Sequence, residues 1–159
     1  IDGRPIPRPT PGEPVAYRWR MGDYSDPPEA LVDRLRPICL ALPDAHEEKA
    51  WVGTRWMVRK KTFAHVLAVD RESPPVLAKV YELTGAADVV TFRSEGPELA
   101  MLRHAGHPYV YAGWGRDVVG LVLDADTDWD EVTELLTESY CVLAPQKLVA
   151  LLDRPPPVD

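Results

Sequence analysis

The spacing of apolar residues predicts a helix at the start of the patterned part of the chain. Asp26 stands where this helix is expected to begin, and Pro28 falls in its first turn, where a missing N–H costs little. Pro37 lies inside the pattern and predicts a kink or an early end. The apolar positions recur at helical spacing: Leu31, Leu35, Ile38 and Leu42.

From residue 47 the apolar residues alternate with a period of two, which is typical of strands. Three strands are predicted, joined by turns at Gly53-Thr54 and around Lys60-Lys61: Glu47–Val52, Arg55–Lys60 and Thr62–Val69. In the third of them, alternation places four side chains on one face: Phe63, His65, Leu67 and Val69.

The middle of the chain continues mainly as extended segments. Strands are predicted at Val76–Glu82, Val89–Arg93 and Val118–Asp124. A short helix is predicted at Gly96–His104, and His107–Trp114 is expected to be extended or irregular. Strands and helices both occur along the chain, which indicates a domain of the α+β class.

The last long helix has the clearest start signal. Asp128 is a favourable N-cap, and Glu131 completes an acidic version of the capping box. Acids in the first turns also suit the positive end of the helix dipole. The apolar stripe runs through Trp129, Val132, Leu136 and Tyr140, widened by Leu135 and Leu143. Pro145 separates it from a short final helix at Gln146–Leu152.

Proline content sets the expected domain boundaries. Residues 1–20 hold five prolines and almost no apolar periodicity, so we predict a disordered or upstream extension. Residues 21–154 are predicted to form a single domain, and residues 155–159 a tail. With 159 residues, the chain can bury a core without disulfides. The alternative of a disulfide between Cys39 and Cys141 has no supporting sequence pattern, so two buried thiols in the cytoplasm are expected. No apolar run is long enough to span a membrane.

Charge is unevenly distributed. The net charge is −7, which disfavours nucleic acid at long range unless a local basic patch is present. Residues 49–69 carry five bases and no acid, whereas residues 117–138 carry eight acids and no base. We therefore predict a dipolar molecule with a basic hairpin and an acidic helix.

Several segments together resemble the MmcQ/YjbR family. They are Leu42-Pro-Asp-Ala-His-Glu-Glu, Trp51-Val-Gly, Val58-Arg-Lys-Lys-Thr-Phe63, Leu77-Ala-Lys79, His107-Pro-Tyr, Gly113-Trp-Gly and Ser139-Tyr-Cys-Val-Leu-Ala-Pro-Gln-Lys-Leu148. The resemblance covers roughly residues 27–152. It implies a two-layer α+β domain in which helices pack against an antiparallel sheet, similar to secretion chaperones and other small binding modules. Members often carry a DNA-binding label. This chain departs from the usual pattern at Lys60, where glycine is common, and at Gln146, where lysine is common.

Patterns for enzymatic chemistry and metal binding are weak. Asp124, Asp126 and Asp128 alternate like the first ligands of a calcium loop, but Trp129 stands where such a loop needs glycine and Leu135 where it needs glutamate. The histidines lack a metal-binding spacing, and neither a nucleophile motif nor a phosphate loop is present. We predict no catalytic residues, no metal and no cofactor.

The best functional candidate is a basic, aromatic surface on the hairpin. Its members are Arg55, Trp56, Arg59, Lys60, Lys61 and Lys79, with Trp114 and Arg116 as an extension that Tyr109 could join. Arginine beside aromatic rings is a composition that binds phosphates and stacks on bases. Simple alternation would put Arg55, Arg59 and Lys61 on one face, opposite Trp56. The competing interpretation is a solvated face whose charges pair with the acidic helix.

The sequence therefore predicts a non-enzymatic, cytoplasmic binding module. The leading hypothesis is weak binding of DNA or RNA through the basic hairpin. The alternative is an adaptor that forms a homodimer or binds another protein, with no role in nucleic-acid binding.

Overall fold

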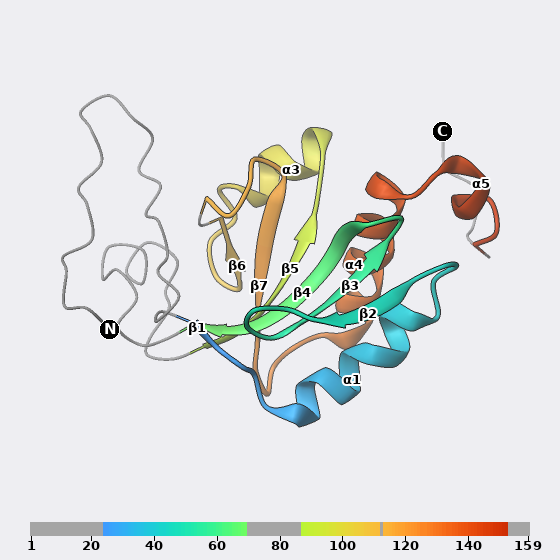
Figure 1. The fold of residues 1–159 in the computed structure, drawn as a ribbon. Helices are drawn as coiled ribbons and strands as arrows, with labels where there is room; N and C mark the ends of the chain where they lie inside the picture. Colours follow the sequence, from blue (N-terminus) through green and yellow to red (C-terminus); the bar gives the residue numbers. More distant parts are fainter. Residues whose placement is uncertain (1–23, 70–86, 112, 153–159) are drawn as a thin grey trace.

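The computed structural model describes residues 24–69, 87–111 and 113–152. Within these residues one antiparallel sheet has the strand order β2-β3-β4-β5-β7-β6, and β1 pairs with β4 (Figure 1). The strands are β1 (Tyr24–Ser25), β2 (His46–Lys49), β3 (Thr54–Val58), β4 (Lys61–Val69), β5 (Ala87–Arg93), β6 (Tyr109–Val110) and β7 (Val118–Leu123). The helices of the described part are α1 (Glu29–Leu40), α3 (Gly96–Leu102), α4 (Trp129–Leu143) and α5 (Gln146–Val149). The predicted two-layer α+β fold is confirmed.

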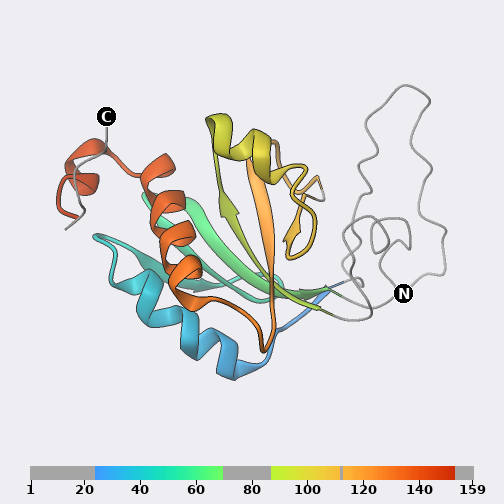
Figure 2. The same ribbon diagram turned by 180° about the vertical axis from the view of Figure 1, so that it is seen from behind.

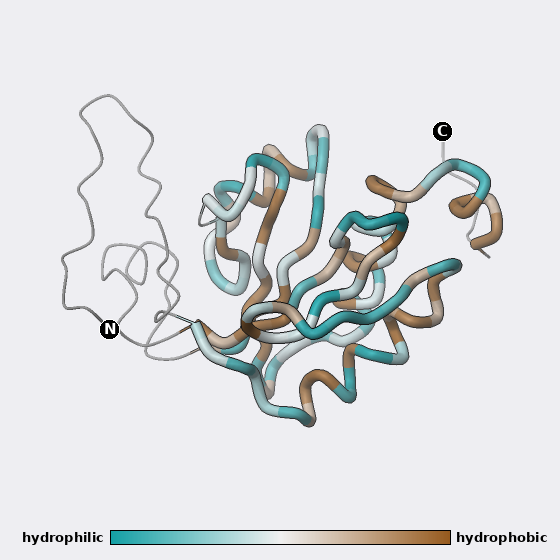
Figure 3. The backbone as a smooth tube through the Cα atoms, in the orientation of Figure 1, coloured by the Kyte–Doolittle hydropathy of each residue, from teal (hydrophilic) through white to brown (hydrophobic). Residues whose placement is uncertain are grey.

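The helices lie on one face of the sheet, where they close the main core (Figure 2). Leu35 of α1 and Leu136 of α4 are fully buried against strand residues such as Trp56 and Val90. A second, smaller apolar cluster lies on the other face: Val52, Leu67, Val69, Val89, Val110 and Val122. Figure 3 shows the matching alternation along α1, where hydrophobic and hydrophilic stretches succeed one another.

Helix α1 begins later than predicted and does not end early at Pro37. It starts at Glu29, and Pro28 is the residue before its first turn. Pro37 does not end the helix, which continues to Leu40. Pro37 lies in the last turn of the helix. Its missing N–H removes one backbone hydrogen bond close to the helix end, where backbone groups already lack partners.

A β-bulge corrects the predicted face of Phe63. Trp56 pairs with Ala64 and Met57 with Thr62, so Phe63 is an extra residue in β4. The bulge turns its ring toward the helices, where it meets the Tyr140 ring edge-on at 5.5 Å. The rest of the predicted face falls on the side of the smaller core, where Leu67 and Val69 belong to its cluster.

Helix α4 starts where the sequence predicts. Polar side chains of this helix also form hydrogen bonds with residues of the sheet. Asp128 accepts hydrogen bonds from the N–H groups of Asp130 and Glu131. The Glu131 carboxylate accepts from the Tyr109 hydroxyl instead of completing the capping box. Buried Ser139 donates to the Phe63 carbonyl at 2.6 Å and accepts from the Arg93 N–H at 2.7 Å.

Several predicted segments lie outside the residues that the structure describes. Residues 1–20 and 155–159 and the strand Val76–Glu82 lie among the undescribed residues. Cys39 is a buried thiol, as predicted, whereas Cys141 is only half-buried. Along the described part of the chain, no helix has the length and apolar character needed to cross a membrane.

Candidate functional site

A row of paired residues crosses the sheet on the face away from the helices. Antiparallel register places Glu48 opposite Arg55, Arg55 opposite His65, and His65 opposite Thr91. Gly120 follows as the partner of Thr91 on β7. Side chains directly opposite on neighbouring strands share one face of the sheet, so this row forms a continuous polar floor. Arg93, two residues after Thr91, lies on the same face.

Three aromatic side chains from distant segments gather beside this row. The Tyr24 and Trp51 rings meet edge-on, with centroids 5.5 Å apart. The Trp114 indole N–H donates to the Tyr24 hydroxyl at 2.9 Å. Trp51 remains 58% exposed, whereas Trp114 is half-buried. We call Tyr24, Trp51 and Trp114 the aromatic cluster.

Gly120 makes room for one member of the aromatic cluster. A Cβ atom at this position would lie 2.7 Å from the Trp114 ring and 2.8 Å from Val89 Cγ1. The indole therefore rests directly on the backbone of β7, where any larger residue would displace it.

The polar row and the aromatic cluster enclose a cavity of about 270 Å³. This volume suits one ring system with an attached charged group, because pockets for drug-sized ligands start at roughly 300 Å³. The polar side chains around it are Arg55, Thr62, His65, Thr91 and Arg93, and the aromatic ones are Tyr24, Trp51 and Trp114. Phe63 and Phe92 also border it, but both are buried in the main core on the helix side of the sheet.

Each arginine of the cavity has one acid partner. An Arg55 terminal nitrogen contacts Glu48 at 3.0 Å, and an Arg93 terminal nitrogen contacts Asp117 at 2.8 Å. Arg55 Nε is buried and has no acceptor among the described residues. A buried donor without a partner costs free energy, and an acceptor on a ligand would remove that cost.

His65 stays neutral at the centre of the floor. Its Nε2 lies 2.7 Å from the Val52 carbonyl, which can only accept, so Nε2 carries the proton and Nδ1 is left as an acceptor. Burial lowers the pKa of His65 below its usual range, and the nearby cations Arg55 and Lys49 lower it further. The Val52 hydrogen bond acts in the opposite direction.

Asp26 stabilises the turn that carries Trp51. Its carboxylate accepts from the Gly53 N–H at 2.6 Å and pairs with Lys49 at 2.5 Å. The Lys49 and Gly53 hydrogen bonds lower the pKa of Asp26. Gly53 has φ +71°, and a Cβ there would lie 1.9 Å from the Val66 carbonyl oxygen, so only glycine fits.

The hairpin residues predicted from the sequence do not form one basic surface. Trp56 is fully buried, and its indole N–H donates to Glu47 at 2.9 Å, so it is not available to stack on a base. Arg59 lies in the β3–β4 turn and pairs with Asp44 at 3.1 Å. Lys60 and Lys61 are exposed and form no ion pair with a described carboxylate.

The remaining predicted residues divide between the cavity and its surroundings. Trp114 lines the cavity with Arg55, whereas Arg116 is exposed and does not line it. Tyr109 bonds Glu131 of α4, away from Trp114. Lys79 lies outside the described residues. Sequence reasoning missed the contributions of Tyr24, His65, Thr91 and Arg93, because only the register places them together.

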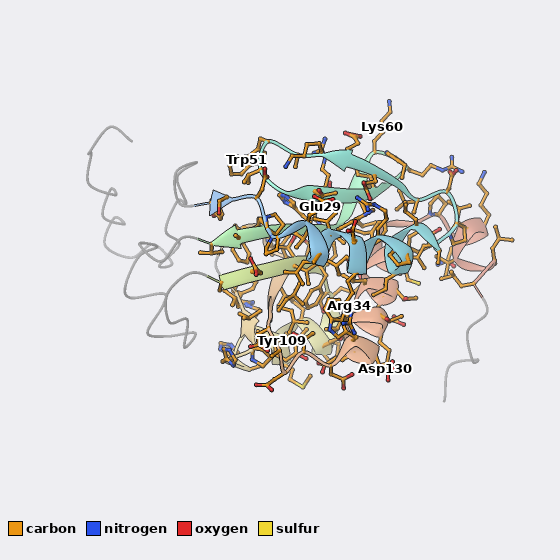
Figure 4. The ribbon with its side chains drawn as sticks, turned by 90° about the horizontal axis from the view of Figure 1, so that it is seen from below. Glu29, Arg34, Trp51, Lys60, Tyr109 and Asp130 are labelled. Atoms are coloured by element: carbon orange, nitrogen blue, oxygen red, sulfur yellow. The ribbon has the colours of Figure 1, made fainter. Side chains whose placement is uncertain are left out.

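The acidic helix does not neutralise the hairpin. Figure 4 shows Lys60 and Trp51 on one side of the molecule, and Asp130 of α4 with Arg34 and Tyr109 on the other. The acids that pair with Arg55 and Arg59 come instead from β2 and from the segment before it. A larger hollow of about 460 Å³ lies between α3 and α4, but six carboxylates line it, so it would repel anions.

The aspartates of the segment 124–128 form hydrogen bonds at the start of α4. Asp124 accepts from the Asp126 N–H at 2.8 Å, while Asp128 caps α4. The described part of the chain holds no group of three or more side chains that could bind a metal ion.

The sequence model of the YjbR family matches residues 40–142, well over half of the chain. The chain belongs to the YjbR family. None of the curated proteins compared with it gives a significant match. The matched region of this YjbR domain contains the whole polar row, Trp51 and Trp114, whereas Tyr24 lies before it.

Proposed function

We propose that this YjbR domain is a non-enzymatic binding module that takes single-stranded nucleic acid on the open face of its sheet. One base would enter the cavity and stack against Trp51 or Trp114. The observation that carries the proposal is a cavity of one-ring size between the exposed Trp51, the half-buried Trp114 and two arginines. Stacking on aromatic rings tolerates any base, and arginines add contacts to phosphate.

The lysines of the β3–β4 turn support this proposal. Lys60 and Lys61 are exposed, and no described carboxylate pairs with them. They would contact the backbone of the strand beyond the base in the cavity. Because the chain carries a net charge of −7, the binding is expected to be weak and to depend strongly on salt.

Titration with a dodecamer of thymidine, followed by tryptophan fluorescence, tests the proposal. Replacing Lys60 or Lys61 by alanine should reduce the slope of log K against log salt by about 0.7 for each lysine removed. Trp51→Ala should cost about 1–3 kcal/mol of binding free energy, because one stacking contact is lost. Trp56 is buried, so the change in emission should come from Trp51 and Trp114, the indoles that line the cavity.

Lys147→Ala provides the matched control. Lys147 is exposed on α5, among the helices of the other layer, and should leave both affinity and salt slope unchanged. The proposal fails if no binding occurs at low salt, or if Lys147→Ala weakens binding as much as Lys60→Ala does.

The exposed Trp51 favours a second candidate, an adaptor that self-associates through the same face. Large apolar side chains at the rim of a hollow are typical of protein interfaces. Light scattering would then give the mass of a dimer, which Trp51→Ala would convert to a monomer and which the thymidine dodecamer would leave unchanged.

A further inference from the structure

The floor of the cavity holds a set of nitrogen donors larger than its acid partners can satisfy. Arg55 and His65 are opposite each other in the register, and Arg93 lies beside them on β5. Glu48 and Asp117 each engage one terminal nitrogen of an arginine. Arg55 Nε stays buried without an acceptor among the described residues.

An oxyanion fits this donor set better than a neutral polar group does. Guanidinium groups bind phosphate oxygens through several N–H groups at once. Thr91, which lies between His65 and Gly120 in the row, adds a hydroxyl to the lining. Glu48 of β2 and Asp117, in the turn before β7, are already bonded to the arginines, so an incoming anion meets a floor with donors to spare.

We propose that the floor of the cavity is a binding subsite for a tetrahedral oxyanion of the phosphate type, and that His65 takes up a proton when the oxyanion binds. The subsite uses the cavity of the proposed function and deepens it. Arg55 and Arg93 hold the oxyanion, and a protonated His65 donates to it through Nδ1 while Nε2 keeps its bond to Val52.

The charged groups around His65 explain why proton uptake accompanies binding. The cations that act on His65 are Arg55 of β3 and Lys49 of β2. Glu48 of β2 and Arg93 of β5 lie in or next to the same polar row, and Tyr24 is the titratable neighbour from β1. In the free protein, burial and cations keep the imidazole neutral at pH 7. An oxyanion adds negative charge next to the ring and favours the protonated form.

Linkage then fixes the sign of the pH dependence. When binding raises the pKa of one group, affinity rises as the pH falls between the pKa of the bound form and that of the free form. For one proton, the gain is at most about tenfold per pH unit. Affinity for the oxyanion is therefore expected to rise as the pH is lowered from 8 to 5.5.

Sulfate is a suitable probe because it does not titrate in this range. Calorimetric titrations of the full chain with sulfate at pH 8 and pH 5.5, in buffers of different ionisation heat, measure affinity and proton uptake together. We expect tighter binding at pH 5.5 with close to one proton taken up at intermediate pH. His65→Gln should bind sulfate with the same affinity at both pH values, and Arg55→Ala should lose binding at both.

His104→Gln is the matched control, because His104 is exposed next to α3 and far from the cavity lining. It should retain the full pH dependence. The imidazole signals of His65 in nuclear magnetic resonance spectra provide a second measurement, since sulfate should raise the pH at which they titrate. The proposal is overturned if sulfate binding has no pH dependence, or if His65→Gln keeps it.

A parallel titration with the dinucleotide of thymidine separates free oxyanions from nucleic acid as the source of the phosphate. Binding of sulfate with proton uptake, together with no binding of the dinucleotide or the dodecamer, supports the subsite and contradicts the proposed function. Binding of the dodecamer without any binding of sulfate supports the proposed function and contradicts the subsite.

Discussion

At the scale of single residues, Gly120 controls whether the cavity can form. A Cβ atom there would clash with the Trp114 ring at 2.7 Å and with Val89 Cγ1 at 2.8 Å. Gly120→Ala should therefore lower the free energy of unfolding by about 1–3 kcal/mol, as overpacking commonly does, and reduce binding. Urea unfolding measures the loss. In a Trp114→Ala background the same change should cost less, and equal costs in both backgrounds would show that the ring is not displaced.

The Glu47 carboxylate provides the hydrogen-bond acceptor for the buried Trp56 side chain. It accepts from Arg36 Nε at 2.9 Å and from the Trp56 indole N–H at 2.9 Å. The Arg36 bond lowers the pKa of Glu47 below its ordinary 4.5, against the opposing effect of burial, and the Trp56 bond lowers it further. A carboxyl group whose pKa is lower in the folded protein than in the unfolded chain stabilises the fold at pH values above its unfolded pKa. This stabilisation is lost as the pH falls through the folded pKa.

We expect Glu47→Gln to reduce the loss of stability below pH 4.5, because no proton then has to be taken up at this position. Glu47→Ala should lower the free energy of unfolding by about 1–3 kcal/mol at neutral pH, since the indole N–H loses its acceptor. Thermal unfolding between pH 3 and pH 7 tests both. If the acid transition is equally steep in Glu47→Gln and in the parent, the lowered pKa of Glu47 does not contribute to the loss of stability.

At the scale of elements, the β3–β4 turn holds backbone strain at two residues. Arg59 has φ 50° and Lys60 has φ 68°, a region that glycine occupies without cost and other residues avoid. Two-residue hairpins of this kind strongly favour glycine in the second position. Lys60→Gly should raise the free energy of unfolding by about 1 kcal/mol, measured as a higher melting temperature.

Lys61→Gly is the control for the turn. Lys61 begins β4, where glycine costs about 0.5–1 kcal/mol of conformational entropy, so this variant should be less stable than the parent. Both variants lose one positive charge. If both change stability in the same direction, the strain at Lys60 does not explain the effect.

The sequence predicted those elements whose signals are local. Asp128 caps α4, and the stripe through Val132 and Leu136 is buried, because capping and helical spacing need only neighbours in the chain. The bulge at Phe63 could not be predicted, since one extra residue in a strand has no composition of its own. The cavity could not be predicted either, because it depends on the register between β3, β4, β5 and β7, which the sequence of one strand does not show.

Pairing of charges was also hidden from the sequence. Arg55 and Arg59 were expected to act together on one face, but each bonds a different acid, at 3.0 Å and 3.1 Å. Residues 49–69 contain no acid, so the partners had to come from segments outside this range. What composition did indicate correctly is the separation between the basic turn and the acidic α4 (Figure 4).

At the scale of the whole molecule, this separation decides how the negative net charge affects binding. Charges further apart than about 8–10 Å are largely screened at physiological salt. Glu134→Gln, an exposed change on α4, should therefore alter affinity for the thymidine dodecamer by less than about twofold at physiological salt. A gain as large as the loss in Lys60→Ala would show that net charge, rather than local charge, governs binding.

The short strand β1, at the beginning of the described residues, contributes to the cavity where binding is proposed. Its Tyr24 bonds the Trp114 indole, a partner 90 positions away in the sequence. Fusing a tag next to Tyr24, cutting the chain there or modifying its hydroxyl would remove a support of the cavity while leaving α1 and α4 packed on the sheet. Shortened versions of the protein that differ only before α1 would then be equally well folded and yet unequal in affinity.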